Sequence, residues 1–398
     1  MKEILRRALS FLVKKEPFLV IEIGNQFVRI SFLKVNFVKK KIEAVKILSE
    51  ANTLSNAAAT LNLVKRLLKR FRGAKRANII LSLDPVLATT VHSTVTLIRD
   101  KPKTPIDEPD LDNRIAQGIW RMFDRERGKA AEKMGVSDLD VLLTDVRVKN
   151  VKLDSHKVLN PLDFQAKTIE IQFTQTFNPR AFVGEVRKII PAEKLVLMAE
   201  NGSLEIDMLT KLARVESFLL VDLFDERVNI YLADGSTITY IDAVSWGKRN
   251  LLTTLSEFFA VTERLAEEIF RIYLVGAASP WMRKRIDRLL VDEFRKLTEP
   301  LAKLTAKYNS AVIYLLAFFE VPDFVFGPEL KRELPGRARI MPVSHELLRA
   351  ELGFELVSKA SPTQNLFSPL AALLEFYFLP SNDKINRIAR RHARWLIS

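Results

Sequence analysis

One stretch near the N-terminus occurs twice in this chain of 398 residues, and the repeat strongly constrains the fold. The sequence FLVIEIGNQFVRI begins at Phe18, and FLLVDLFDERVNI begins at Phe218, 200 positions later with no gap. Apolar residues match at both ends, and Glu22 in the first copy corresponds to Asp222 in the second. The repeat indicates two similar halves, each with the same strand–turn–strand unit.

Each copy predicts two buried strands joined by a tight turn, because apolar runs flank a short polar break. In the first copy, Gly24-Asn25 is a two-residue hairpin signal. In the second, Ala233-Asp234-Gly235 turns the chain into a further strand over 236–243. The first turn is therefore either a hairpin kept for packing or a loop whose N–H groups hold a phosphate.

Composition limits the chemistry that these halves can carry. The hydrophobic content of 48% is typical of a packed protein, and the length predicts two or more subdomains. The chain has no cysteine, which excludes disulfides and zinc–thiolate sites and fits a reducing cytosol. Its four histidines lack ligand spacing, so we expect no metal site. The acidic run at 107–112 is either a metal loop or, as we favour, the cap of a following helix.

The formal net charge of +14 has three possible explanations: nucleic acid, an anionic membrane surface or an acidic protein as partner. No zinc finger or RNP-type aromatic motif is found, so we expect no nucleic-acid partner. The longest apolar run, 311–319, is less than half of a membrane span. Lys14, Lys15 and Glu16 interrupt the apolar N-terminal stretch, so we expect no signal peptide.

The paired hairpins make the chain similar to the superfamily of actin, sugar kinases and heat-shock chaperones. Other stretches resemble the bacterial division protein FtsA and its pilus-assembly relative PilM: WGKRNLLT at 246–253, AEE at 266–268, NPLDF at 160–164, RIMP at 339–342 and FSPLAAL at 367–373. The resemblance spans about residues 17–380 in order. It implies an α/β chain with a duplicated actin-like (RNase H-type) fold and a small α+β domain inserted in the first half.

The resemblance and the linker at 101–109, rich in proline and charge, together predict the domain limits. These are a basic N-terminal helix over 1–16, the first half over 17–94 and 178–217, the inserted domain over 95–177, the second half over 218–380 with a helical subdomain at about 251–307, and a basic amphipathic C-terminal helix over 381–398.

In that superfamily, one hairpin in each half grips nucleotide phosphates and magnesium. The matching positions here are Glu22, Gly24, Asn25 and Asp222. Phe224 replaces a glycine of the second hairpin, and Ala317-Phe318-Phe319 stands where relatives have Gly-Gly beside adenosine. We therefore expect no catalytic residues, no effective ATP turnover and no cofactor, with bound ATP and magnesium as the alternative.

The resemblance implies an FtsA-like adaptor that lies in the cytoplasm on the inner face of the cell membrane. It would tether filaments of the tubulin-like division protein FtsZ and self-associate into filaments. The basic cluster Arg283, Lys284, Arg285 and Arg288 falls where the family binds its partner's tail. A solvated helix face explains this cluster equally well.

The C-terminal segment predicts a helix with one apolar and one basic face. Such a helix is typical of a membrane interface, and similar tails anchor FtsA. The candidate membrane residues are Ile385, Arg387, Ile388, Arg390, Arg391, Arg394, Trp395 and Leu396. The alternative is a helix that docks on its own domain.

Two other functions remain open. One is a PilM-like component of a type IV pilus platform, which binds the cytosolic tail of a membrane protein in a groove of the inserted domain. The other is an active actin-like ATPase, against which the altered loops argue.

Overall fold

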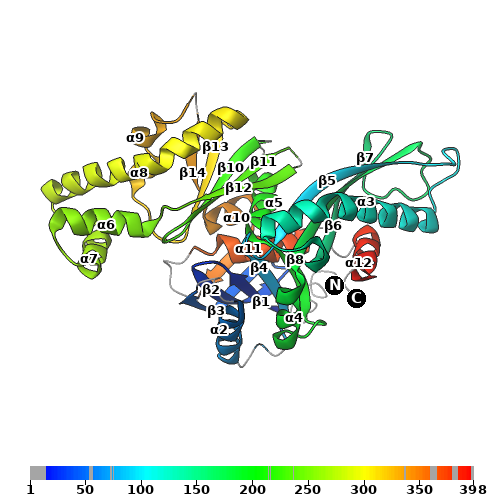
Figure 1. Ribbon diagram of the computed structural model, residues 1–398, viewed down its shortest axis with the longest axis horizontal. Coiled ribbons are helices and arrows are strands. Elements are labelled where there is room, and N and C mark those ends of the chain that lie inside the picture. The colour runs from blue at the N-terminus through cyan, green and yellow to red at the C-terminus, as the bar shows by residue number, and fades with distance from the viewer. Residues whose placement is uncertain are drawn as a thin grey trace, which may run out of the picture. The chain divides into compact units, whose positions relative to one another are not determined.

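The computed structural model of the protein describes residues 15–52, 57–71, 74, 76–213, 215, 217–235, 237–335, 338–358, 365–378 and 384–395 (Figure 1). These residues form two compact units. Unit 1 takes the described residues within 15–208, 354–358 and 368–395, and unit 2 takes those within 209–353 and 365–367. The predicted helix over 1–16 lies outside the described residues, except for Lys15 and Glu16.

A six-stranded sheet with the order β15-β3-β2-β1-β4-β9 forms the centre of unit 1. Its strands are β1 (Glu16–Ile23), β2 (Phe27–Asn36), β3 (Lys41–Ala51), β4 (Asn78–Leu83), β9 (Leu195–Glu200) and β15 (Glu355–Ser358). The run from Phe18 to Ile23 is buried on both faces, because β1 lies between antiparallel β2 and parallel β4. The apolar run of the first repeat is therefore a central strand, as predicted.

Helices α2 (Ala57–Lys69) and α4 (Arg180–Ile189) pack on the sheet of unit 1. Two further helices, α5 (Asn201–Ala213) and α11 (Phe367–Phe378), begin after β9 and near the end of the described chain. Leu61, Val64 and Leu67 of α2 are buried at helical spacing, and they join the core that includes Ile21 and Leu81 of the sheet.

Unit 2 has a five-stranded sheet with the order β12-β11-β10-β13-β14. Its strands are β10 (Ser217–Leu223), β11 (Val228–Asp234), β12 (Thr237–Val244), β13 (Val312–Ala317) and β14 (Arg339–Pro342). Its helices are α6 (Lys248–Phe259), α7 (Glu263–Leu274), α8 (Pro280–Tyr308), α9 (Pro328–Lys331) and α10 (His345–Leu352), with 3-10 turn η3 (Asp323–Phe326).

The sheets of the two units have the same topology. In each, a central strand pairs antiparallel with the next strand in the chain and parallel with a later one. The order β3-β2-β1-β4-β9 in unit 1 corresponds strand for strand to β12-β11-β10-β13-β14 in unit 2. This correspondence confirms the duplication predicted from the repeat.

A separate four-stranded sheet with the order β5-β8-β6-β7 lies between β4 and β9 in the chain. Its elements are β5 (Thr89–Ile98), α3 (Glu108–Met134), the 3-10 turn η2 (Asp138–Asp140), β6 (Val141–Leu153), β7 (His156–Val158) and β8 (Thr168–Pro179). We call Thr89–Pro179 the inserted domain. Its sheet and α3 share one hydrophobic core, and the sheet extends slightly beyond both predicted limits, 95 and 177.

The acidic run at 107–112 begins α3. The side chain of Asp107 accepts a hydrogen bond from the N–H of Asp110, and Pro109 lies in the first turn of the helix. This geometry confirms the predicted helix cap.

The last described helix, α12 (Lys384–Trp395), packs on the inserted domain beside α3 (Figure 1). Within the described residues, no helix is both long enough and apolar enough to cross a membrane.

Candidate functional site

The predicted phosphate loop of the first half is closed by an ion pair inside its own hairpin. Glu22 on β1 faces Arg29 on β2, and both side chains are buried. The guanidinium donates from Nε and Nη2 to the two carboxylate oxygens, each at 2.5 Å. Glu22 is therefore neutralised by a bidentate arginine, whereas a magnesium ligand needs a free carboxylate edge.

The backbone groups of the same turn are also hydrogen-bonded to the protein. Gly24 N–H donates to the carbonyl of Phe27 at 2.9 Å, and Asn25 N–H donates to the carboxylate of Asp84 at 3.3 Å. Asp84 is buried and also accepts from Val86 N–H at 3.1 Å. Asn52 donates from its side chain to the carbonyl of Gly24 at 2.9 Å. A carboxylate of the chain thus takes the position of an anion at this turn.

The second hairpin is closed by aromatic side chains instead. Phe224 is buried and stacks on Phe318, with ring centroids 4.4 Å apart and an interplanar angle of 21°. Phe224 N–H donates to the carbonyl of Arg227, and Phe318 N–H to that of Leu223, both at 3.0 Å. Asp222 is fully buried on β10, opposite Asn229 on β11.

The N-terminus of α6 packs against this second turn. The N–H groups of Lys248 and Arg249 donate to the carbonyls of Phe224 and Asp225, at 3.2 and 2.8 Å. A helix N-terminus is otherwise a good anion site, but carbonyl oxygens occupy it here. A Cβ on Gly247 would lie 2.4–2.5 Å from the backbone of Phe224 and Asp225, so only glycine permits this approach.

The charge at the second turn is also unfavourable for phosphate. Burial raises the pKa of Asp225, and Lys248 opposes this shift. Glu226 lies beside it and pairs with Arg249. Among the described residues, no group of three or more histidine and carboxylate side chains could hold a metal ion. The hairpins therefore do not fit the requirements of a magnesium-bound phosphate, and we derive no chemistry through one.

The predicted partner cluster lies on α8. Arg283, Lys284, Arg285 and Arg288 are all exposed. The guanidinium of Arg285 lies over Trp281 and Phe258, 4.7 and 5.0 Å from the ring centroids. These rings are 63% and 41% exposed, which is unusual for side chains of their size. The prediction identified the cations and missed the two aromatic rings, which make this an amphipathic surface.

The candidate membrane helix is docked on the inserted domain. Ile385, Ile388, Ala389 and Ala393 are buried in the core that it shares with α3 and β6. The side chains of Arg394 and Trp395, and all of Leu396, lie outside the described part. Membrane binding stays a prediction, and it would require the apolar face of α12 to leave the domain.

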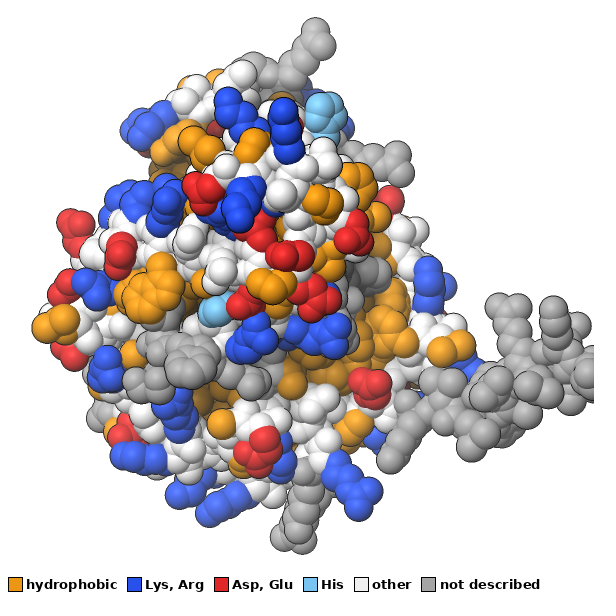
Figure 2. Space-filling model, turned by 90° about the vertical axis from the view of Figure 1, so that its right-hand side faces the viewer, with side chains coloured by type: hydrophobic (Ala, Val, Ile, Leu, Met, Phe, Trp, Pro, Cys, Tyr) orange, Lys and Arg blue, Asp and Glu red, His pale blue; other side chains and the backbone are white. Residues whose placement is uncertain are grey.

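The basic face of α12 also has partners within the chain. Lys384 pairs with Glu108, and Arg391 pairs with Asp112 on α3. His392 lies 3.1 Å from the same Asp112 carboxylate. Basic and acidic side chains are interspersed on the face shown in Figure 2.

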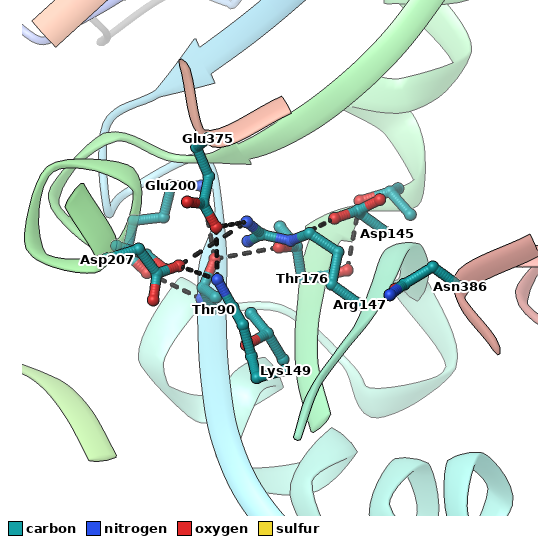
Figure 3. Close-up of polar contacts among 12 residues, drawn as sticks. Thr90, Asp145, Arg147, Lys149, Thr176, Glu200, Asp207, Glu375 and Asn386 are labelled. Atoms are coloured by element: carbon teal, nitrogen blue, oxygen red, sulfur yellow. Dashed lines mark hydrogen bonds and ion pairs between the residues drawn. The ribbon is translucent and has the colours of Figure 1, made fainter. Parts of the chain in front are cut away.

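A buried charge cluster that was not predicted from the sequence links the inserted domain to α5 and α11 within unit 1 (Figure 3). Arg147 on β6 lies 2.9 Å from Asp145 and donates to Glu375 of α11 at 3.1 Å. Lys149 pairs with the same Glu375 and with Asp207 of α5, the latter at 2.6 Å. Two helices distant in sequence, α5 and α11, therefore converge on β6.

A buried histidine, His92, lies close to this cluster. Burial, together with the charges of Lys149 and Arg147, holds the pKa of His92 well below its usual range. The ring lies 3.1 Å from the hydroxyl of Ser203 and 3.0 Å from that of Thr174. Burial opposes charge on Arg147, yet the surrounding carboxylates raise its pKa. The arrangement is a fixed polar joint between β5, β6, β8 and α5.

A sequence signal for the cluster exists, but it is ambiguous. Asp145, Arg147 and Lys149 alternate with Val146 and Val148, which predicts one charged and one apolar face of a strand. Such a charged face normally lies in water. The carboxylates that cover it come from α5 and α11, and no local pattern pairs them with β6.

No protein-family profile matches the chain, and no curated protein is similar to it. Among solved structures, a PilM–PilN type IV pilus biogenesis complex is similar over 94% of this chain and 98% of that chain, with a TM-score of 0.50 and 15% identity. The ethanolamine utilization protein EutJ from Carboxydothermus hydrogenoformans covers 90% of this chain and 89% of its own, with a TM-score of 0.39 and 10% identity. A Bacteroides thetaiotaomicron protein with an actin-like ATPase fold and unknown function is similar over 92% of this chain and 97% of its own, with a TM-score of 0.38 and 8% identity.

At such identities, similarity establishes the fold alone. The two sheets have one strand order, a four-stranded domain is inserted in the first half, and nearly the whole PilM chain is matched. This chain therefore has a duplicated α/β fold with an inserted four-stranded domain, and it shares this fold with the matched chain of the PilM–PilN complex.

Proposed function

We propose that this protein is a non-enzymatic scaffold, similar to PilM, in the assembly of a type IV pilus or a related membrane machine. One observation carries the non-enzymatic part: the turn that grips phosphate in relatives is satisfied by the chain's own Arg29 and Asp84. A phosphate would have to displace a buried carboxylate from the turn amide, and it would meet Glu22 already paired.

The docked α12 supports the pilus reading over the FtsA-like reading. An FtsA-like tail places its apolar face in lipid, whereas Ile385 and Ile388 are buried in protein here. We propose that the chain reaches the inner face of the membrane through a partner, the cytosolic tail of a membrane protein. The similarity to the PilM–PilN complex supports the same proposal.

A second candidate function rests on the amphipathic surface of α8. The Arg285 guanidinium, which lies over the rings of Trp281 and Phe258, suits a peptide with acidic and apolar residues. The resemblance to FtsA implies that a tail of FtsZ binds in this region. A division adaptor that polymerises therefore remains the alternative proposal.

Nucleotide titration tests the non-enzymatic part. We expect isothermal titration of the full chain with magnesium-ATP to give no saturable heat, and phosphate release to stay at the buffer rate. Binding with a Kd in the micromolar range would overturn this part of the proposal. The variant Arg29→Met then tells whether the first hairpin holds the nucleotide.

Capture from the native cell tests the partner. Tagged full-length protein should recover a pilus-platform membrane protein, and the charge-reversal variant Arg285→Glu should recover it equally well. Recovery of FtsZ by the wild type, lost in Arg285→Glu, would replace the pilus reading with the division reading. Lys303→Glu, on the same helix, is the matched control, because Lys303 is exposed and pairs only locally with Glu299.

A further inference from the structure

One edge of the inserted sheet is incompletely paired with strands. β6 pairs with β8 along its length, but on its other side β7 pairs only with Val151, Lys152 and Leu153. Over Val141–Asn150, no strand of the described chain lies on that side. An open edge presents N–H and C=O groups to any strand that can approach.

A side chain of α12 imitates the missing strand. Asn386 Oδ1 accepts from Val148 N–H at 2.8 Å, and its Nδ2 donates to Val148 C=O at 3.1 Å. A residue on a neighbouring antiparallel strand exchanges the same two hydrogen bonds with its partner. Asn386 is 1% exposed, so its amide serves this edge and not solvent.

The remaining contacts of α12 define what else this edge recognises. Ile385 and Ile388 fill apolar positions beside β6. Lys384 and Arg391 pair with Glu108 and Asp112 at the start of α3. The occupant therefore combines a peptide-like amide, apolar side chains and flanking positive charge.

The ion pairs between α12 and α3 contribute little to the docking of α12. Its ion pairs with α3 are largely exposed, and such pairs contribute roughly 0–1 kcal/mol each. A helix of 12 residues is marginal by itself in water. Its docking thus depends on Asn386 and a few apolar side chains.

We propose that α12 is a detachable latch over the outer edge of β6, and that the edge accepts an extended peptide strand when α12 leaves. The incoming segment is basic and has apolar residues at alternate positions, since it must replace the contacts of Lys384, Ile385 and Asn386. Its backbone would pair with β6 around Val148, as in other cases of strand addition. The proposal deepens the scaffold function, because it names the surface and the class of partner segment.

Hydrogen exchange of the full chain tests the latch. In Asn386→Ala, protection of the Val148 amide should fall at least tenfold, while protection in β1 and β10 stays unchanged. Lys384→Glu with Arg391→Glu repels α12 from α3 without touching the buried amide and should lower the same protection. Arg387→Glu reverses one charge on an exposed α12 residue and is the control. Unchanged protection at Val148 in both latch variants would overturn the proposal.

Peptide binding tests the exposed edge. The probe is a fluorescent synthetic peptide with two lysines followed by alternating valine and threonine. We expect at least tenfold tighter binding to Asn386→Ala than to wild type, with new protection of β6 amides. The chain has no native cysteine, so Glu108→Cys with Lys384→Cys can be joined by a bismaleimide, and this locked protein should not bind.

Three results would contradict strand addition. They are equal affinity in the unlocked and locked proteins, binding without protection of β6, and release of α12 by anionic vesicles with no peptide binding in any variant. The last would make lipid the ligand of α12 and leave the edge without the proposed partner. None of these three results depends on pilus proteins or ATP. Failure of the scaffold function is therefore distinguishable from failure of the latch.

Discussion

The hairpins β1–β2 and β10–β11 have the same register but are closed by different chemistry. At the equivalent position, Glu22 faces Arg29 in the first and Asp222 faces Asn229 in the second. The first turn is satisfied by charge, through Arg29 and Asp84. The second is filled by Phe224 and capped by the N-terminus of α6. A duplicated frame can thus keep its strand register while different side chains close the turn of each copy.

The difference predicts different sensitivities to mutation. A buried ion pair makes each partner depend strongly on the other, because a lone buried charge is costly. Packing of backbone against backbone is sensitive to added volume instead. Substitutions at Arg29, Asp84 and Gly24 in the first hairpin, and at Gly247 beside the second, test this contrast.

The largest effect is expected for Arg29→Met, which leaves Glu22 buried without its partner. The free energy of unfolding should fall by about 3–5 kcal/mol. Urea denaturation followed by circular dichroism measures it. The matched change in the second hairpin, Asn229→Met, removes no charged side chain. It should therefore lower the free energy of unfolding by less than Arg29→Met does.

The double variant Glu22→Leu with Arg29→Leu is the internal control for that prediction. Replacement of both buried charges by apolar groups should recover most of the lost stability. If the double variant is as unstable as Arg29→Met, the cost comes from packing and not from an uncompensated charge.

Gly247→Ala is expected to cause the next largest loss of stability. Its Cβ would lie within 2.5 Å of the carbonyl carbon and oxygen of Asp225, and backbone atoms cannot move aside as a flexible side chain can. The free energy of unfolding of unit 2 should fall by about 3 kcal/mol. A thermal scan with exchange protection of α6 measures the loss. Unchanged protection at the N–H of Arg249 would show that the close approach is not required.

Asp84→Ala should lower the free energy of unfolding by about 1–2 kcal/mol, because it removes the acceptor of the N–H groups of Asn25 and Val86. The freed N–H groups then resemble those of a phosphate loop. Sulfate at high concentration should therefore raise the Tm of this variant more than that of the wild type. An equal rise in both would show that Asp84 does not take the place of an anion.

The duplication was the part of the fold that the sequence predicted best. Central strands buried on both faces are continuous apolar runs, so FLVIEI and FLLVDL mark the centre of each sheet directly. The cap of α3 at Asp107 was also predictable, because side-chain capping is local.

The site depended on contacts that no local pattern encodes. Arg29 follows Glu22 by only seven residues, and a hairpin register would have brought them together. Asp84 and Glu375, by contrast, reach their partners from elements 59 and 228 residues away. The docking of α12 belongs to the same class, since an amphipathic helix has the same pattern whether lipid or protein covers its apolar face.

The smallest effect is expected for Gly24→Ala. Gly24 has no positive φ, and a Cβ there would lie 3.4 Å from the carbonyl oxygen of Phe27, an ordinary contact. The free energy of unfolding should therefore change by less than about 0.5 kcal/mol. If Gly24→Ala destabilises the chain as much as Gly247→Ala, the first turn is a packing device like the second, and the comparison between charge and packing fails.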